Sequence, residues 1–394
     1  MQIRDSRLVV GLFLVITGVS VLILAATYDS INVGAYFSNL LSNARAYVDA
    51  NENVEADPEP VPIPSDSALA RKCTQPGVLN CFTFDSSSGL YYNWPVGTAC
   101  DYAFKGQTNY RFGNGRQGRG NTVAVIQNGQ CLFPQIDSTT AHSGAGSLKI
   151  TIPSNSSADS GGHFTEVFKR NRDGNPAGIH IGPGSRFGNV LYFQFYQRFD
   201  DNFLSTNFAC SRGECGGWKQ AIWYGNPPNG RSASSLEVTM NNGWQRGVPQ
   251  MYGQVGSDYY GIQDARGCTY KADARSGTDY MEPPCIRYKP NQWMEFTGRI
   301  EILGESNQPS SRVQLWIDGE LAIDYKRARI DWSGASGEGF GQFLLSPYHT
   351  DKNPSEVHPI GHVWYDDLII STQPIAVAGR GASVSPANTA AAPH

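Results

Sequence analysis

The residues that first point to chemistry are polar side chains that alternate along short apolar segments. In the segment 190–199, Gln194, Tyr196 and Arg198 fall on alternate positions, so an extended strand would place them on one face. Gln220 and Glu237 continue the set on two further segments. Amides, a phenol, a guanidinium and a carboxylate on one sheet would suit the hydroxyls and carboxylates of sugars. The sequence therefore predicts one polar lining built from three strands.

Aromatic and cationic residues accompany this lining. Trp223, with Trp218 and Tyr224, is predicted to stack on sugar rings, and Lys219 is predicted to contact the same ligand. The alternative for each tryptophan is a place in the core, which is where tryptophans of a sandwich usually lie.

The elements that must position these residues are short strands. Alternation or β-branched and aromatic runs predict strands at 122–126, 147–152, 190–199, 218–224, 236–241, 293–302, 312–317, 321–325, 341–345 and 362–371. Asp318 and Gly319 stand between two of these runs, a pair that is typical of a two-residue hairpin turn. No segment of 12 or more residues in the body shows helical periodicity. The body is therefore predicted to be all-β, as an antiparallel β-sandwich or jelly roll.

Charge and composition exclude other classes. The chain of 394 residues has 31 Lys and Arg against 35 Asp and Glu, a net charge of −4, which leaves no electrostatic footprint for nucleic acid. Hydrophobic residues make up 40%, enough for a sizeable core, so a wholly disordered chain is excluded.

The order of several motifs resembles that of exported bacterial proteins of the concanavalin A-like lectin/glucanase superfamily. In chain order the motifs are AHSGAGSLKITIPS, YFQFYQRF, GGWKQAIW, IRYKPNQWMEFTGRIEI, SRVQLWIDGELAIDY, GFGQFLLSPYH and HVWYDDLIIST. The resemblance spans about residues 140–373. It implies a concanavalin A-like jelly roll that binds or cleaves a polysaccharide, since the superfamily includes jelly-roll polysaccharide lyases. The resemblance implies no organic cofactor. Some of these folds bind calcium, but no EF-hand pattern occurs in the sequence.

The resemblance also separates two reactions. Retaining hydrolases of this superfamily carry two catalytic carboxylates on one strand, in the pattern Glu-x-Asp-x-x-Glu. The most similar segment of this chain, 236–241, has only one carboxylate, Glu237, so the resemblance disfavours hydrolysis. Lyases need a group that neutralises a uronate carboxylate, together with a base and an acid. Gln220 resembles the glutamine on the central strand of the lyases, and Tyr348 with His349 would serve as acid and base. A uronate-containing polysaccharide is therefore the expected substrate.

Eight cysteines favour an oxidising compartment. Connectivity cannot be deduced from sequence, but short separations suggest Cys73 with Cys81, Cys100 with Cys131, Cys210 with Cys215, and Cys268 with Cys285. No Cys or His spacing typical of a zinc site occurs, so no metal site is predicted.

The N-terminal residues predict a membrane anchor. Residues 8–28 carry no charge and are long enough to span a bilayer, and Arg4 and Arg7 precede them, so the N-terminus is expected in the cytoplasm. The alternative is a cleaved signal peptide. With 1–28 as cytoplasmic tip and anchor, the main domain would lie in the periplasm or outside the cell.

Three further segments complete the predicted organisation around a β domain at 73–373. Residues 29–50 predict an amphipathic helix with an apolar stripe, 51–72 a proline-rich acidic linker, and 374–394 a flexible tail. The stripe would lie on the lipid bilayer, pack on an integral membrane subunit, or extend the anchor. A second function class follows from it, namely a non-catalytic structural subunit of a large membrane complex, such as a photosynthetic or respiratory one. Its partner-binding residues would be Phe37, Leu40, Leu41 and Tyr47.

Overall fold

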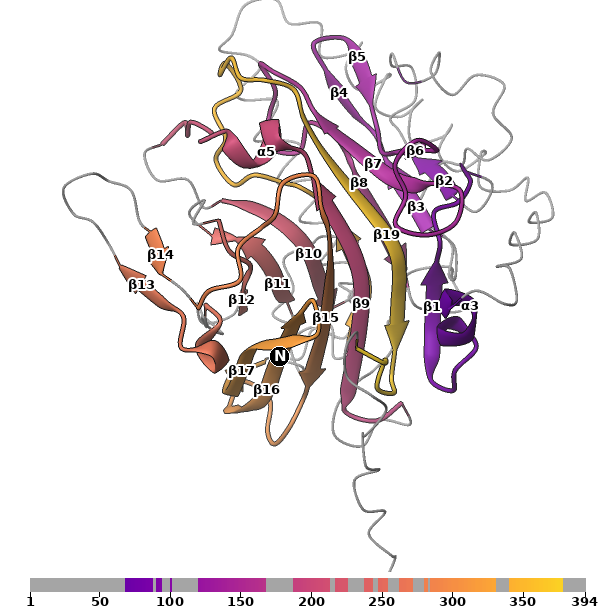
Figure 1. Cartoon of the computed structure of the whole chain (residues 1–394), viewed down its shortest axis with the longest axis vertical. Helices are drawn as coiled ribbons and strands as arrows, with labels where there is room; N and C mark the ends of the chain where they lie inside the picture. The colour runs from indigo at the N-terminus through magenta and orange to yellow at the C-terminus, as the bar shows by residue number, and fades with distance from the viewer. Residues whose placement is uncertain are drawn as a thin grey trace, which may run out of the picture. The chain divides into compact units, whose positions relative to one another are not determined.

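A computed structural model shows a chain that is predominantly β (Figure 1). The structure describes residues 68–87, 90–93, 100, 120–167, 187–212, 217–225, 237–243, 247–253, 262–271, 280–282, 284–330 and 340–377. The predicted anchor, the amphipathic segment, most of the linker and most of the tail lie outside these residues. None of the helices that the structure describes is long and apolar enough to cross a membrane.

The larger of the two main sheets has eight strands. In spatial order they are β17 (Glu320–Arg329), β16 (Pro309–Ile317), β15 (Trp293–Glu301), β9 (Val190–Phe199), β19 (Gly361–Ser371), β7 (Ser147–Ile152) and β6 (Gln135–Asp137), with β1 (Val78–Phe82) paired to β19. The central position of β9 and β19 places the alternating residues of β9 in the middle of this sheet (Figure 1).

The second main sheet has seven strands. In spatial order they are β12 (Gln250–Gly253), β11 (Glu237–Asn242), β10 (Trp218–Gly225), β18 (Phe340–Leu345), β8 (His163–Val167), β3 (Gly120–Val123) and β2 (Leu90–Asn93). All its pairs are antiparallel except β2 with β3, which is parallel. Two small hairpins stand apart from both sheets, β4 (Val125–Gln127) with β5 (Gln130–Leu132) and β13 (Thr269–Lys271) with β14 (Tyr280–Glu282).

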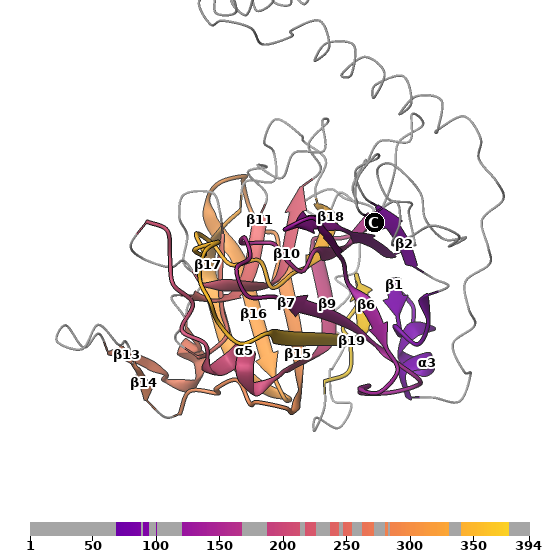
Figure 2. The same ribbon diagram turned by 90° about the horizontal axis from the view of Figure 1, so that it is seen from above.

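The core fills the space between the two main sheets, whose strands are seen together from above in Figure 2. The ring of Phe193 on β9 lies 3.9 Å from that of Trp223 on β10, measured between centroids, and both side chains are fully buried. The Tyr365 hydroxyl on β19 donates to the carbonyl of Gln220 on β10. Burying each large apolar side chain contributes roughly 1.5–3 kcal/mol, so this layer holds the sheets face to face. The prediction of a β-sandwich is therefore confirmed.

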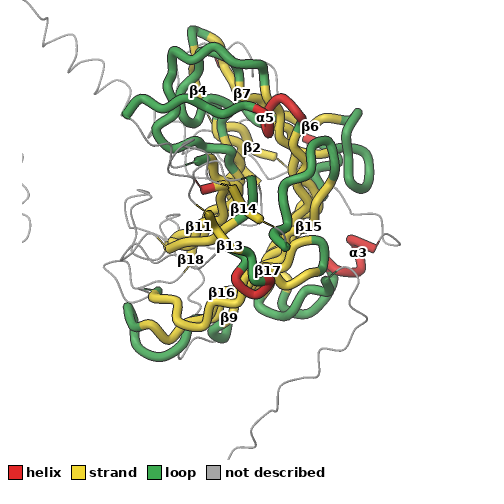
Figure 3. The backbone as a smooth tube through the Cα atoms, turned by 60° about the vertical axis from the view of Figure 1, so that its left-hand side comes forward, coloured by secondary structure: helices red, strands yellow, loops and turns green. Residues whose placement is uncertain are grey.

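Helices are short and few among the described residues, as the tube in Figure 3 shows. They are α3 (Ala68–Cys73), α5 (Asp201–Ser205) and the 3-10 turn η4 (Asp264–Arg266). The side chain of Asp200 caps α5 by accepting the N–H of Phe203. Residues 68–72, predicted as the end of the linker, instead form α3, because Leu69 packs against Ile369 and Ile375.

The predicted hairpin between β16 and β17 is present. Asp318 and Gly319 both have positive φ, +48° and +84°, as a turn of this kind requires. The Asp318 carboxylate also accepts the N–H of Glu295 at 2.9 Å, which ties the turn to β15.

Three of the four predicted disulfides are present, Cys73–Cys81, Cys100–Cys131 and Cys268–Cys285. For the fourth, Cys215 lies outside the described residues. No described cysteine is free.

Candidate functional site

The prediction of one polar lining is wrong, because its members lie in different sheets. Gln194, Tyr196 and Arg198 are on β9 of the eight-stranded sheet, whereas Lys219 and Glu237 are on β10 and β11 of the seven-stranded sheet. The outer faces of two sheets packed face to face point in opposite directions. Alternation identifies the two sides of a strand, but it does not identify the sheet that the strand joins.

Gln220 lies in the core and not on an outer face. It is fully buried at a bulge between Lys219 and Ala221. Its amide donates to the Gln197 side chain at 2.7 Å, and its oxygen accepts the Tyr288 hydroxyl. Trp223 is also buried in the core, so it does not reach a sugar-binding surface.

Tyr348 and His349 follow β18 but face different surroundings. Tyr348 is half-buried, and burial raises its pKa, with a smaller contribution from the carboxylates of Asp159 and Asp351. His349 is 3% exposed and packs on Phe208, and burial lowers its pKa to about 4. The structure therefore does not bring Gln220, Tyr348 and His349 together on one open surface.

Lys219 belongs to a polar set on the outer face of the seven-stranded sheet. Its neighbours Trp218 and Ala221 point into the core, whereas Lys219 points outward. Its ammonium donates to Thr350 Oγ1 at 3.0 Å and lies 5.3 Å from the centroid of the Tyr252 ring. The strand register aligns Lys219 with Asn241 and Asn241 with Gln250, and it pairs Thr239 with Tyr252. We call these five residues the Lys219 face, namely Lys219, Thr239, Asn241, Gln250 and Tyr252.

The Lys219 face is well packed. Lys219 is 7% exposed and Asn241 2% exposed, while Tyr252 is half-buried. The Asn241 Oδ1 atom is buried without a hydrogen-bond partner in the part of the chain that the structure describes. A buried acceptor without a hydrogen-bond partner lowers the free energy of unfolding, unless another group, such as a ligand, pairs with it. Glu237 lies on β11, and its side chain is outside the described part of the structure.

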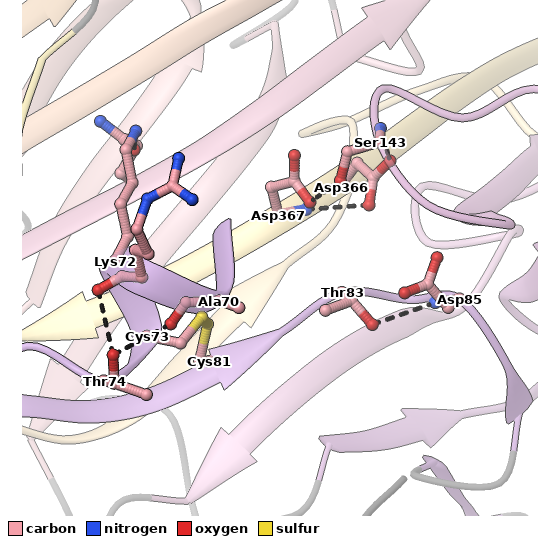
Figure 4. Close-up of a disulfide and its surroundings, with 12 residues drawn as sticks. Ala70, Lys72, Cys73, Thr74, Cys81, Thr83, Asp85, Ser143, Asp366 and Asp367 are labelled. Carbon is pink, nitrogen blue, oxygen red and sulfur yellow. Dashed lines mark hydrogen bonds between the residues drawn. A yellow bond between two sulfur atoms is a disulfide. The ribbon is translucent and has the colours of Figure 1, made fainter. Parts of the chain in front are cut away.

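A second polar site lies on the outer face of the eight-stranded sheet, and we call it the His142 pocket. Its volume is about 170 Å³. Figure 4 shows part of it, where Asp366 and Asp367 on β19 lie near Ser143 and where Lys72 extends from α3. The lining residues are Ala68, Leu69, Lys72, Thr83, Asp85, His142, Ser143, Gly144, Gln194, Tyr196 and Asp367.

Asp367, which lines the pocket, and its fully buried neighbour Asp366 are both held by many donors. Asp367 lies 2.6 Å from the His142 Nδ1 atom and accepts the Ser143 hydroxyl at 2.7 Å. Asp366 accepts the backbone N–H groups of His142, Ser143 and Asp367. Burial, and then the charge of Asp367, nevertheless raise the pKa of Asp366 to about 8. The surroundings of Asp366 therefore favour its neutral, protonated form.

Gln194 and Tyr196 of the sequence prediction lie in this pocket. Gln194 accepts from the Lys72 ammonium at 2.6 Å and donates to Thr297. The Tyr196 hydroxyl donates to Glu295 at 2.6 Å, and the His142 ring stacks on Tyr196 with centroids 3.5 Å apart. Burial and the Glu295 carboxylate raise the Tyr196 pKa strongly. Both side chains are engaged by the protein itself.

The sequence offers one signal for the His142 pocket, the Tyr365-Asp366-Asp367 motif of β19, because two adjacent carboxylates on an apolar strand need a special environment. Residue types alone predict neither His142 nor Lys72 as their neighbours. The described residues contain no group of three or more His, Cys, Asp or Glu side chains that could hold a metal. Asp366 and Asp367 are taken up by protein donors, so they do not fit a calcium site and no role is assigned to that ion.

Phe37, Leu40, Leu41 and Tyr47 lie outside the described residues, so the structural-subunit hypothesis has no support from the structure.

No family model and no curated protein matches this chain. Among solved structures, the alginate lyase Aly36B matches at 16% identity over 58% of this chain and 82% of its own, with a TM-score of 0.32. The endo-β-1,4-glucuronan lyase from the fungus Trichoderma reesei matches at 12% identity over 64% and 90%, with a TM-score of 0.36. The marine PL-14 alginate lyase from Aplysia kurodai matches at 11% identity over 61% and 87%, with a TM-score of 0.35. Likenesses with TM-scores this low carry no weight for the function of this chain.

Proposed function

We propose that the protein binds a uronate-containing polysaccharide at the edge of the Lys219 face, where Tyr252 on the edge strand β12 is half-buried, and cleaves it by β-elimination. The observation that carries this proposal is the Lys219 ammonium, fixed by Thr350 Oγ1 at 3.0 Å and lying 5.3 Å from the Tyr252 ring centroid. A cation and a phenol side by side on a sheet are the two kinds of group that elimination from a uronate requires.

In this proposal Lys219 pairs with the uronate carboxylate and stabilises the negative charge that develops when the C5 proton leaves. An ammonium held in a largely buried site is more effective in this role than one in water. The amide of Asn241, whose Oδ1 atom has no hydrogen-bond partner among the described residues, lies next to Lys219 in register and suits a hydroxyl of the same sugar.

Tyr252 is the proposed acid and base. In its deprotonated form the Tyr252 hydroxyl removes the C5 proton. The C4–O bond to the next sugar then breaks as the C4=C5 double bond forms. The phenol returns the proton to the departing oxygen, so the phenolate is regenerated and no other reactant is needed.

Tyr348, the acid expected from sequence, is the second candidate. The Lys219 N–H donates to the Tyr348 carbonyl at 2.7 Å, so the two residues are neighbours. Burial, however, and then the Asp159 and Asp351 carboxylates raise the pKa of Tyr348. Negative charge there would repel a uronate and disfavour the phenolate.

The test is to compare Tyr252→Phe with Tyr348→Phe on a panel of alginate, polyglucuronate and polygalacturonate, following the ultraviolet absorbance of the unsaturated product. Tyr252→Phe should lose about 10²–10⁴-fold in rate, and Tyr348→Phe much less. A larger loss of rate in Tyr348→Phe than in Tyr252→Phe would identify Tyr348 as the catalytic acid instead. A wild-type protein that generates no such product on any of these polymers would remove the lyase proposal.

We also propose that the sandwich is of the concanavalin A-like jelly-roll type and that it works outside the cytoplasm. The chain crosses repeatedly between the two sheets, from β7 to β8, β9 and β10 and again from β17 to β18 and β19, which supports the first proposal. The disulfides support the second. The membrane span over residues 8–28 stays a prediction.

A further inference from the structure

Cations and aromatic rings alternate across four strands on the outer face of the eight-stranded sheet. The register pairs Lys149 on β7 with Trp364 on β19, Trp364 with Arg198 on β9, and Arg198 with Trp293 on β15. We call these four residues the Arg198 row. Since neighbouring strands lie about 4.8 Å apart, the row is about 14 Å long, which exceeds one sugar ring.

Arg198 differs from the other arginines of this face. Arg299 pairs with Glu301 at 2.7 Å, and Arg312 pairs with Asp324 at 2.6 Å. For Arg198, the described residues supply no carboxylate partner, and its buried Nε atom has no hydrogen-bond partner. Its guanidinium lies over the Trp364 ring, 5.6 Å from the centroid. An arginine that is held in place by an aromatic ring and has no carboxylate partner among the described residues is positioned to bind an anion.

The carboxylates around the row are already engaged. Asp137 accepts the Trp364 indole N–H at 2.9 Å and lies 3.6 Å from the Lys149 ammonium. Glu295, in the next row, accepts the Tyr196 hydroxyl. The Arg198 charge is therefore the one in this row that no neighbouring carboxylate compensates among the described residues.

Trp293 supplies an apolar surface beside this charge. It is half-buried, and the His142 ring meets it in an edge-to-face arrangement with centroids 5.9 Å apart. Trp364 is 7% exposed and the Tyr196 ring is covered by His142, so the exposed part of Trp293 is the aromatic surface next to Arg198. A ring face beside a guanidinium matches a carboxylated sugar, whose C–H face stacks on an aromatic ring while its carboxylate pairs with the cation.

We propose that the Arg198 row is a second binding surface for a carboxylated polysaccharide. The class of ligand rests on the proposed function, but the surface is separate, because the row and the Lys219 face are on the outer sides of opposite sheets. The row holds polymer without cleaving it, since the Tyr196 hydroxyl in the next row is already donated to Glu295. Two surfaces on one domain raise retention on a polymer through effective concentration, without tighter contact at either surface.

The experiment measures retention on immobilised polyglucuronate and alginate, with cellulose as the neutral polymer. The starting protein is the double variant Lys219→Met, Tyr252→Phe, in which the Lys219 face is disabled. This protein should keep measurable affinity for the acidic polymers. Adding Arg198→Gln and Trp293→Ala should lower that affinity at least tenfold. Adding Arg312→Gln instead, which removes one positive charge from the same face, should leave it within about twofold. Thermal unfolding of each protein shows whether it is folded.

The outcomes separate the two proposals. If the Lys219→Met, Tyr252→Phe protein loses all retention while the wild type binds, the Arg198 row is overturned and the Lys219 face stands. Equal retention with and without the Arg198 and Trp293 substitutions also overturns the row, as does equal binding to cellulose. If the row substitutions abolish retention but the wild type produces no unsaturated product, the row stands and the lyase proposal falls. A wild type that binds neither acidic polymer overturns both.

Discussion

Lys219 shows how one residue combines structural and functional constraints. Its ammonium is largely buried on a sheet face, where a charge persists only with polar partners, and Thr350 is one of them. The same burial makes the charge more effective toward a bound carboxylate, because less water screens it.

Lys219→Met tests this role, since methionine keeps the apolar stem and removes the charge. A hydrogen bond to a charged group is worth about 1.5–3 kcal/mol, so the kcat/KM for a polyuronate should fall roughly ten- to hundredfold. Steady-state kinetics measure the loss, and Lys326→Met, at a lysine whose side chain is 70% exposed, is the matched control. Equal losses in the two variants would contradict a specific role for Lys219.

His349 makes a pH-dependent contribution to stability. Its pKa is lowered by burial from 6.5 to about 4, so between these values the unfolded chain binds a proton that the folded protein does not. The free energy of unfolding therefore falls as the pH drops from about 6.5 to 4, by about 3 kcal/mol for this group.

Denaturant unfolding of the wild type and His349→Gln across this pH range measures that contribution. The variant should lose less stability on acidification than the wild type, by about the same 3 kcal/mol. Burial also lowers the pKa of His163 to about 4, but this residue is present in both proteins and contributes equally to both. The difference between their pH-dependent losses of stability is therefore due to His349. Parallel curves would show that His349 does not carry the effect.

At the scale of elements, the central pair β9 and β15 depends on one glycine. Gly298 on β15 faces the core opposite Phe193, and a Cβ at this position would overlap the Phe193 ring. Phe193 in turn contacts Trp223 of the other sheet, so it has no room to withdraw.

Gly298→Ala should therefore destabilise the protein by about 1–3 kcal/mol through overpacking. The measurement is the free energy of unfolding in denaturant for Gly298→Ala, Phe193→Leu and the double variant. The double variant should lose less than the sum of the two single variants, because leucine leaves space for the new methyl group. Additive losses would mean that the two side chains do not compete.

At the scale of the whole molecule, two disulfides close loops of very different length. Cys73–Cys81 joins α3 to β1 across 8 residues, whereas Cys100–Cys131 closes a loop of 31 residues. In the chain-entropy description, a longer loop constrains the unfolded chain more.

Removing Cys100–Cys131 with two serines should therefore cost about 3.7 kcal/mol of unfolding free energy, and removing Cys73–Cys81 about 2.5 kcal/mol. Chemical denaturation of the two double variants without reductant measures the difference. An inverted order would show that native-state contacts, such as those of α3 with β19, outweigh loop entropy.

The sequence by itself determined the features that depend on near neighbours along the chain. The strands at 147–152 and 190–199 and the Asp318-Gly319 hairpin follow from alternation and turn chemistry, since they involve residues whose proximity the chain itself enforces. Short cysteine separations suggested the three disulfides that are present, although the sequence alone left their connectivity open.

The tertiary structure alone decided which strands share a sheet and which side of each strand faces the core. Gln220 is polar yet lies in the core, since a bulge and the partners Gln197 and Tyr288 satisfy its amide there. Trp364 is apolar yet lies on the outer face, between Arg198 and Lys149. Side-chain type could not predict either position, because the partners that make each favourable come from distant parts of the chain.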